Sequence, residues 1–352
     1  ATLTHLWQNT LNHPHIGIHD NFFTLGGHSL LALRLADRIK EAFGGRLLLA
    51  DLYQHPTPAA MAARIDSAGA GRHDWPSSIV PLRATGSRPP LFCIHPKNGT
   101  VFCFAGLAQT LEAERPVFGV QAHGLDPEVR PLESIEELAA AYLRDIVEVQ
   151  PQGPYLLSGY SLGGTIAYEL TRQLAAQGRE VAGLIMLDSY PVLGDDSPTL
   201  VEFEAMDDAA FLVHQFGGAL PVNEEHLRSL TPDARMLHLL DLAAEAGLES
   251  EHMDLKSMTR YVDIVRAHTR AALTYRPLPY SGPVLLLRCD DLGPDAGPDP
   301  RDNWSALIGE SLIIQDVPGS HMTMLDPPNL TTVAAHISKY VADLGSSGKR
   351  ER

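Results

Sequence analysis

The sequence predicts a small all-α bundle followed by a larger α/β unit whose sheet is interrupted by a helical insertion. Apolar residues recur at helical spacing before residue 67, and short strand-like apolar runs alternate with helical stretches after residue 88. Between them, residues 68–88 are rich in Gly, Ser and Pro, which is typical of a linker. The alternation predicts a mostly parallel, doubly wound sheet over residues 89–345, and a polar tail follows at 346–352.

The first unit, residues 1–67, is expected to be a bundle of the four-helix type. Leucine and tryptophan recur at helical spacing over residues 3–11, leucine and isoleucine recur over residues 30–39, and a third helical stretch covers residues 61–65. Ala1 already falls inside a helical pattern. We therefore expect the first helix to be trimmed and the chain to come from a longer polypeptide.

The second unit carries apolar runs of strand length, at Leu91–His95, Val117–Gln121, Tyr155–Gly159, Leu184–Asp188, Val284–Arg288 and Leu312–Val317. Between about residues 191 and 279 the alternation stops and the pattern is helical throughout. Because strand-like runs resume after this segment, we expect a helical lid inserted into the order of the sheet.

The composition excludes several classes of protein. Hydrophobic residues make up 44% of the 352 residues and charged residues 20%, as in folded globular proteins and unlike disordered chains. The formal net charge of −16 repels phosphate backbones and anionic lipid, so we expect no nucleic acid and no membrane as partners. The 3 cysteines lack C-x-x-C spacing, which predicts no metal site and a reducing, cytoplasmic location.

A G-x-S-x-G motif occupies residues 159–163, directly after a strand-like run and directly before a helical stretch. In this setting the motif is typical of the nucleophile elbow of α/β-hydrolases, where a strained turn raises the serine, here Ser161, above the sheet. The backbone N–H of Leu162 is then placed to donate to an oxyanion. The alternative is a glycine-rich turn whose serine only caps the following helix.

An α/β-hydrolase carries its triad in the chain order serine, acid, histidine. His321 follows a strand-like run and a Pro-Gly-Ser turn, so we expect it to be the general base. Two positions remain open for the acid. Asp188 ends the strand-like run after the elbow helix, and Asp290 and Asp291 end a later run.

The oxyanion hole of this fold needs a second N–H, from the loop after the first strand of the sheet unit. Residues 95–99, His-Pro-Lys-Asn-Gly, form that loop, and we expect the backbone N–H of Lys97 to be the donor. A surface or helical position is expected for eight further histidines, and a helix face for His336; the eight are His5, His13, His15, His19, His214, His226, His238 and His268.

A second serine, Ser29, stands at the start of a helical stretch after Gly26-Gly27. The glycines allow a tight turn, and the aromatic pair Phe22-Phe23 anchors that turn to a core. A phosphate attached at Ser29 would be stabilised by the unpaired N–H groups and the dipole of the helix. From these residues alone an ordinary serine N-cap is the simpler interpretation.

The segment Asp20–Leu31, D-N-F-F-T-L-G-G-H-S-L-L, resembles the signature of the peptidyl carrier domains of nonribosomal peptide synthetases. The serine of G-G-H-S in that signature bears 4′-phosphopantetheine, so the resemblance implies that Ser29 is the attachment site. It covers roughly residues 3–65 and implies an arm that holds an acyl chain as a thioester.

The second unit resembles the type I thioesterase domains that terminate those synthetases, over about residues 79–345. The motifs that carry the resemblance are P-P-L-F-C-I-H-P at 89–96, G-Y-S-L-G-G at 159–164, Leu187-Asp188 and Gly319-Ser320-His321. Family members take their acid after the strand that ends here at Asp188 and carry a helical lid after it, which favours Asp188 over Asp290. One departure is Lys97-Asn98, which stands where small residues are common.

The resemblance implies a terminal carrier and thioesterase module in which an acyl chain passes from the thioester on Ser29 to Ser161. Water would then release an acid, and an amine or hydroxyl of the chain itself would release a ring. Upstream adenylation and condensation domains, a phosphopantetheinyl transferase and a peptidyl thioester substrate are the implied partners. Two alternatives remain, a catalytically silent hydrolase fold used for docking and a proofreading thioesterase.

Overall fold

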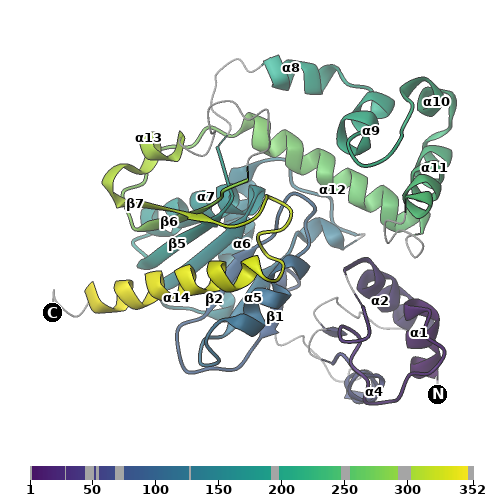
Figure 1. The fold of residues 1–352 in the computed structure, drawn as a ribbon, viewed down its shortest axis with the longest axis horizontal. Coiled ribbons are helices and arrows are strands. Elements are labelled where there is room, and N and C mark those ends of the chain that lie inside the picture. The colour runs from purple at the N-terminus through teal and green to yellow at the C-terminus, as the bar shows by residue number, and fades with distance from the viewer. Residues whose placement is uncertain are drawn as a thin grey trace. The chain divides into compact units, whose positions relative to one another are not determined.

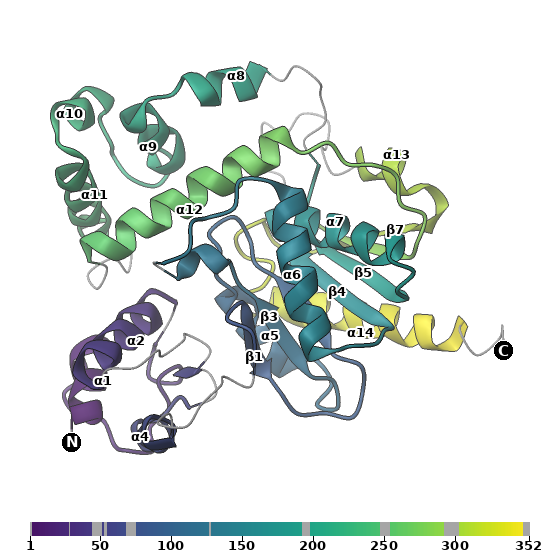
Figure 2. The ribbon, with the colours of Figure 1, turned by 180° about the vertical axis from the view of Figure 1, so that it is seen from behind.

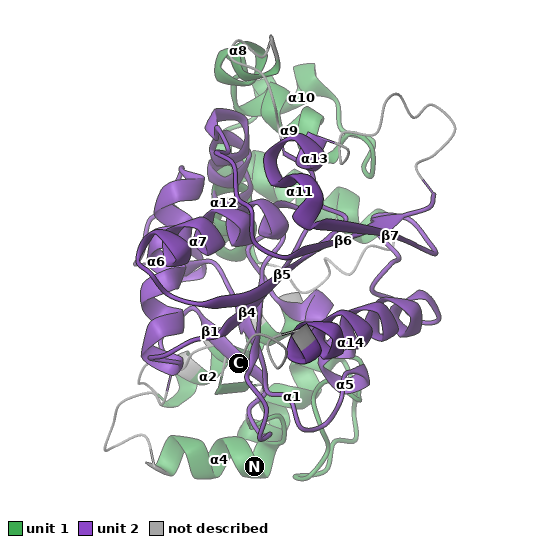
Figure 3. Ribbon diagram, turned by 90° about the vertical axis from the view of Figure 1, so that its left-hand side faces the viewer, with its two compact units in different colours: residues 1–73, 196–263 green, residues 74–195, 264–352 purple. Residues whose placement is uncertain are grey.

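The computed structural model describes residues 2–27, 29–43, 51–52, 55–67, 75–126, 128–191, 198–246, 254–291 and 303–347. Two compact units divide the chain, one of residues 1–73 with 196–263 and the other of residues 74–195 with 264–352 (Figure 3). The helical insertion is thus shared between the units. In the described residues, no helix is both long enough and apolar enough to cross a membrane.

The N-terminal bundle contains, within its described residues, the helices α1 (Thr2–Leu11), α2 (Ser29–Phe43) and α4 (Pro58–Ser67) (Figure 1). Its core includes Trp7 and Phe22, whose rings meet edge to face with centroids 6.2 Å apart. Gly27 leaves room for this core, since a Cβ there would lie 2.3 Å from the Phe22 ring. A bundle of the four-helix type has a fourth helix, and residues 44–50 and 53–54, between α2 and α4, lie outside the described residues.

The described strands form one sheet of seven. They are β1 (Ile79–Arg83), β2 (Leu91–Ile94), β3 (Val117–Val120), β4 (Tyr155–Tyr160), β5 (Val181–Leu187), β6 (Val284–Cys289) and β7 (Leu312–Val317). Their order is β1-β3-β2-β4-β5-β6-β7, and every neighbouring pair is parallel except β1 with β3. Each of the six apolar runs singled out in the sequence overlaps one of the strands β2 to β7.

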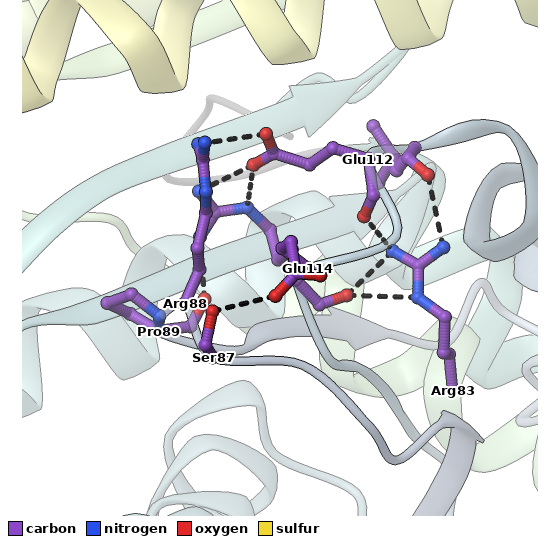
Figure 4. Close-up of polar contacts among 8 residues, drawn as sticks. Arg83, Ser87, Arg88, Pro89, Glu112 and Glu114 are labelled. Carbon is purple, nitrogen blue, oxygen red and sulfur yellow. Dashed lines mark hydrogen bonds and ion pairs between the residues drawn. The ribbon is translucent and has the colours of Figure 1, made fainter.

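The prediction of a linker over residues 68–88 is wrong for the second half of that range, because the strand β1 occupies residues 79–83. Pro81 broke the apolar pattern, yet a proline is tolerated on an edge strand, which is where β1 lies. The residues that follow are also tied to the sheet unit (Figure 4): Arg88 pairs with Glu112 at 2.8 Å and Ser87 donates to Glu114 at 2.8 Å. The first half of that linker, residues 68–74, lies outside the described residues.

Helices cover both faces of the sheet. The described helices and 3₁₀ turns of this unit are η2 (Phe102–Phe104), α5 (Ala105–Thr110), η3 (His123–Leu125), α6 (Ile135–Val149), α7 (Leu162–Ala176), α13 (Trp304–Ile308), η5 (Gly309–Ser311) and α14 (Asn329–Ser347). Helices α6 and α7 pack together on one face, and α5 and α14 lie on the other (Figures 1 and 2). Because α14 continues through Ser347, the polar tail expected at 346–352 begins later than expected.

The insertion between β5 and β6 contains, in its described residues, the helices α8 (Pro198–Ala205), α9 (Asp208–Phe216), α10 (Glu224–Ser229), α11 (Pro232–Glu245) and α12 (Leu255–Thr274). Four of them begin with side-chain caps, from Asp207, Asn223, Thr231 and Asp254. The described part of the insertion is free of strands, as the sequence pattern indicated. Helix α12 crosses the boundary between the two units, at residues 263 and 264.

Candidate active site

Ser161 stands on a strained turn between β4 and α7. Its backbone angles, φ 57° and ψ −126°, are unfavourable for a residue with a Cβ, as expected of a nucleophile elbow. Glycines make the turn possible: a Cβ on Gly159 would lie 2.0 Å from the carbonyl oxygen of Gly163, and one on Gly163 would lie 2.3 Å from that of Ile94. In this described turn the Ser161 side chain makes no capping hydrogen bond to α7. The geometry therefore favours a hydroxyl available for chemistry over a helix cap.

His321 follows β7 and brings its imidazole to Ser161. The Nε2 atom of His321 lies 3.1 Å from Ser161 Oγ, within hydrogen-bond distance. Tyr160 holds His321 in two ways, because its hydroxyl donates to the main-chain carbonyl of His321 and the two rings stack with centroids 5.1 Å apart. Burial raises the pKa of Tyr160, so its hydroxyl stays protonated and remains a donor.

Asp188 lies on the other side of the imidazole. Its Oδ2 atom is 2.6 Å from His321 Nδ1, and its Oδ1 atom accepts a hydrogen bond of 3.0 Å from the N–H of Cys289. The Asp188 side chain is only 8% exposed, so its carboxylate is shielded from water, whereas the His321 side chain is 38% exposed. Because an ionised carboxylate only accepts, we assign the proton to Nδ1, which leaves Nε2 to accept the proton of Ser161.

Asp290, the competing acid, does not contact His321 and instead holds the turn that precedes it. Its Oδ1 atom accepts a hydrogen bond of 3.1 Å from the N–H of Gly319, and the N–H of Asp291 donates to the Gly319 carbonyl at 3.2 Å. The structure therefore brings Asp188 to the histidine, and it gives the two later aspartates a place in the supporting loop.

The two candidate oxyanion donors lie on neighbouring backbone segments. Leu162 begins α7 directly after Ser161, and Lys97 lies in the loop that leaves β2, the strand beside β4. We name residues His95–Gly99 the oxyanion loop. This loop rests on the elbow, because a Cβ on Gly163 would lie 2.5 Å from the carbonyl oxygen of His95. This close contact is compatible with one oxyanion site to which both segments donate. The donor roles of Leu162 and Lys97 remain predictions.

The cysteines of this unit are poor rivals to Ser161 as nucleophiles. Burial raises the pKa of Cys103 to about 12 and also raises that of Cys93, so neither is a thiolate at neutral pH. Among the described residues, no three or more His, Cys, Asp or Glu side chains are grouped so as to hold a metal ion.

Comparison with known proteins identifies both parts of the chain. Residues 89–341 match the family model of the thioesterase domain. The chain belongs to the thioesterase family. Residues 1–65 match a second model, that of the phosphopantetheine attachment site. The chain is therefore a helical carrier domain, to which phosphopantetheine is attached covalently, followed by a thioesterase with the α/β-hydrolase fold, and the resemblance derived from the motifs is confirmed.

The relatives of this carrier and thioesterase pair are nonribosomal peptide synthetases. A dimodular nonribosomal peptide synthase of Bacillus subtilis (strain 168) is 32% identical over 350 residues, which cover 97% of this chain and 14% of the relative. The chain thus spans about one seventh of that relative. A solved four-domain nonribosomal peptide synthetase in its holo form, bound to AMP and glycine, aligns with a TM-score of 0.65 and 33% identity, over 96% of this chain and 25% of that chain.

A solved thioesterase domain shows the same fold at lower identity. The NocB thioesterase domain, in covalent complex with a fluorophosphonate nocardicin G analog, has a TM-score of 0.54 and 22% identity. The alignment covers 75% of this chain and 99% of that domain, so it bears on the fold of the thioesterase unit alone.

Ser29 is the first residue of α2 in the carrier domain, where the motif predicts phosphopantetheine. The surrounding backbone fits a phosphodiester, because α2 is 15 residues long and its first turn contains no acidic residue to repel the phosphate. Two backbone hydrogen bonds fix the preceding loop. The N–H of Phe22 donates to the Pro56 carbonyl at 2.8 Å, and the N–H of Gly27 donates to the Phe22 carbonyl at 2.9 Å. The Ser29 side chain itself lies outside what the structure describes.

Two residues near the site escaped the sequence analysis. Tyr160 occupies a variable position of the G-x-S-x-G pattern, which says nothing about its contact with His321. His268 lies on a helix as expected but is buried, with 1% exposure. A signal for its burial was present, because Ile264, His268 and Ala271 fall at helical spacing on one apolar face of α12, and all three are buried.

Proposed function

We propose that this chain is the carrier and thioesterase module that releases the product of a nonribosomal peptide synthetase. An acyl or peptidyl chain carried on Ser29 passes to Ser161 and then leaves the enzyme. The observation that supports this most strongly is the hydrogen-bonded series Ser161, His321 and Asp188 on a strained elbow, at 3.1 and 2.6 Å. A carrier domain on the same chain supplies the substrate at high effective concentration.

Ser29 would hold the phosphopantetheine through a phosphodiester at the start of α2. When bound, the group supplies a thiol that carries the acyl chain as a thioester. The residues of the thioesterase domain then need only recognise and cleave that thioester.

Acyl transfer to Ser161 follows from the positions of the three side chains. His321 Nε2 takes the proton of Ser161 while Oγ forms a bond to the thioester carbonyl carbon. Asp188 stabilises the imidazolium through Nδ1–H, and the N–H groups of Leu162 and Lys97 donate to the developing oxyanion. The carbon–sulfur bond then breaks, and the proton on His321 goes to the leaving sulfur.

Release reverses the roles of the same groups. His321 takes a proton from the incoming nucleophile, which forms a bond to the acyl carbon, and returns a proton to Ser161 as the ester breaks. Water gives a linear acid, and an amine or hydroxyl within the acyl chain gives a ring. We assign the choice to the helical insertion, because a lid selects between these nucleophiles by admitting or excluding water.

The proposed partners follow from the relatives. A carrier domain requires a phosphopantetheinyl transferase, and the synthetases that match this chain support adenylation and condensation domains upstream of Ser29. A peptidyl thioester is the proposed substrate. The cytoplasmic location inferred from cysteine usage remains a prediction.

Intact-mass spectrometry of an acylated carrier tests the proposal. A phosphopantetheinyl transferase with octanoyl-coenzyme A would load Ser29, and the mass of the chain would be followed with time. We expect the unchanged chain to lose the octanoyl group and the Ser161→Ala variant to retain it, with Ser29→Ala as the control that cannot be loaded.

The same experiment separates the alternatives. Equal retention by the unchanged chain and by Ser161→Ala would indicate a silent docking domain. Faster clearance of an acetyl group than of a dipeptidyl group would indicate proofreading. Equal loss from both proteins would remove Ser161 from the mechanism.

A further inference from the structure

The oxyanion loop is supported by two buried histidines, His95 at its start and His268 from α12. They are 0% and 1% exposed, and both belong to the sheet unit. His95 Nδ1 lies 2.7 Å from the carbonyl oxygen of Pro96, and His268 Nδ1 lies 2.8 Å from that of Lys97. The two rings stack nearly in parallel, with centroids 4.9 Å apart and planes 14° apart. Consecutive carbonyls of the loop are thus each held by an imidazole.

The partners of these rings define their tautomers. A carbonyl oxygen only accepts, so we assign a proton to Nδ1 of both His95 and His268. His95 Nε2 then accepts from the hydroxyl of Tyr142, 2.6 Å away on α6. Burial lowers the pKa of both histidines, that of His268 to about 4. Both rings are therefore neutral at pH 7 and act as fixed donors to the loop.

Holding a carbonyl also orients the amide on the other side of the peptide. The Pro96–Lys97 bond is trans, so its N–H points opposite to its C=O. The Pro96 carbonyl accepts from His95 and, at 2.9 Å, from the N–H of Gly99. The N–H of Lys97 is therefore turned away from the buried rings. The Lys97 carbonyl, held by His268, fixes the next peptide of the loop in the same manner.

The position of His268 on α12 is one that an apolar residue would fill as easily. Its helix neighbours Ile264 and Ala271 are buried, and Ile264 itself packs against the loop, because a Cβ on Gly99 would lie 3.1 Å from its Cγ2 atom. A histidine here places a polar group in an apolar face, which costs stability unless its hydrogen bond is made. The bond that it makes goes to the residue whose N–H we assign to the oxyanion.

We propose that His268, together with His95, is a positioning residue for the oxyanion loop: His95 holds the Pro96–Lys97 peptide, whose N–H we assign to the oxyanion, and the Nδ1–H of His268 holds the next peptide through the Lys97 carbonyl, so that the Lys97 backbone is fixed from both sides during attack by Ser161. This inference rests on the proposed function, because it assumes that Ser161 attacks a carbonyl next to this loop. Misplacing the loop affects the transition state more than the bound substrate, so it lowers rates without weakening substrate binding.

The test compares two replacements of His268 in the full chain. His268→Phe keeps a stacked ring and removes the donor, whereas His268→Asn keeps an amide N–H near the position of Nδ1. His214→Phe, at an exposed position of α9, serves as the matched control. Thermal unfolding of each variant, followed by circular dichroism, sets a working temperature at which all of them are folded.

The probe is diisopropyl fluorophosphate, followed by intact mass at saturating concentration. Ser161 Oγ forms a bond to phosphorus, fluoride leaves, and His321 takes the serine proton, while the phosphoryl oxygen occupies the place of the oxyanion. We expect His268→Phe to slow this step about 10- to 100-fold, less than the roughly 10²- to 10³-fold loss of a whole donor, and His268→Asn to remain within about fivefold of the unchanged chain. In His268→Phe the maximal rate should fall while the probe concentration that gives half the maximal rate stays unchanged, because the loop acts on the transition state rather than on binding.

The outcomes distinguish the inference from the proposed function. Equal rates for His268→Phe and the unchanged chain would overturn the positioning role alone. An Asn variant as slow as the Phe variant would show that the donor is irrelevant and would also overturn the positioning role. If the unchanged chain fails to react at Ser161, the proposed function fails together with the inference.

Discussion

Asp188 Oδ2 lies 2.6 Å from His321 Nδ1, although Asp188 follows β5 and His321 follows β7, with β6 between them. The intervening strand joins the pair, because the N–H of Cys289 at the end of β6 donates to the other carboxylate oxygen of Asp188. Asp188 also has a positive φ of 44°, a strained conformation like that of Ser161. Three strand ends thus fix the carboxylate that orients the histidine.

The first prediction separates the two candidate acids. Asp188→Asn should slow octanoyl release by about 10³- to 10⁴-fold, because an amide cannot stabilise the imidazolium in the required tautomer. Asp290→Asn should cost far less, since its carboxylate only holds the Gly319 N–H in the preceding turn. Single-turnover release from loaded Ser29 measures both rates. A greater loss from Asp290→Asn would mean that the wrong strand was assigned to the acid.

A second prediction concerns Tyr160. Tyr160→Phe removes the hydroxyl that donates to the His321 carbonyl but keeps the stacked ring, and we expect release to slow about fivefold, the effect of roughly 1 kcal/mol. Tyr160→Leu loses both contacts and should be slower still. Tyr190→Phe is the matched control, because Tyr190 is 48% exposed and lies two residues after Asp188. Identical rates for Tyr160→Phe, Tyr160→Leu and the control would show that the ring does not position His321.

A third prediction follows from the buried state of His268. Its pKa is about 4 in the folded chain, against 6.5 for an ordinary histidine, so the unfolded chain binds more protons between these values. The free energy of unfolding should therefore decrease as the pH falls from about 6.5 to about 4, by up to about 3 kcal/mol from this residue. In His268→Asn the free energy of unfolding should depend less on pH over this range.

Urea unfolding followed by tryptophan fluorescence measures this effect. A Trp7→Phe background leaves Trp75 and Trp304, both in the sheet unit, as the tryptophans of the chain. His95 stacks on His268 and lies 2.6 Å from the Tyr142 hydroxyl, and His268 contributes to the lowered pKa of His95, so the difference between the two curves reports His268 together with its effect on His95. Parallel curves with and without His268 would contradict its neutral, buried state.

A fourth prediction tests the contact between the elbow and the oxyanion loop. A Cβ on Gly163 would lie 2.3 Å from the Ile94 carbonyl oxygen and 2.5 Å from that of His95, and neither backbone atom can move cheaply. Gly163→Ala should therefore slow release by at least about 10²-fold, the order of the loss of an oxyanion donor. Gly218→Ala is the control, since no atom of the described residues would lie within 4 Å of its Cβ. Full activity of Gly163→Ala would show that the loop tolerates displacement.

Much of the sheet could be predicted from the sequence, because buried parallel strands form continuous apolar runs bounded by turns. The strands β2 to β7 each had such a run. The edge strand β1 was missed because Pro81 interrupts its short apolar stretch, and a proline is compatible with a strand only at an edge, which is known only once the neighbour β3 is known. Edge strands are therefore missed when the prediction rests on local pattern alone.

The site was predictable to the extent that its residues lie in local motifs. Ser161 is placed by its glycines and His321 by its position after the last strand. The acid was ambiguous because an aspartate directly follows each of β5 and β6, and the residue pattern does not reveal which carboxylate reaches the histidine. His268 was missed for the same reason, since its contact with Lys97 joins residues 171 positions apart in the chain.

The central claim is that the acyl group moves from the arm on Ser29 to the hydroxyl of Ser161. Rapid-quench peptide mapping tests it most directly: the holo chain, loaded with octanoyl-pantetheine, is stopped at successive times, digested, and analysed by tandem mass spectrometry. We predict that octanoyl ester on the Ser161 peptide rises as the thioester on the Ser29 peptide falls, and then decays. Loss of the thioester with no ester on Ser161 at any time, and at an unchanged rate in Ser161→Ala, would contradict the claim.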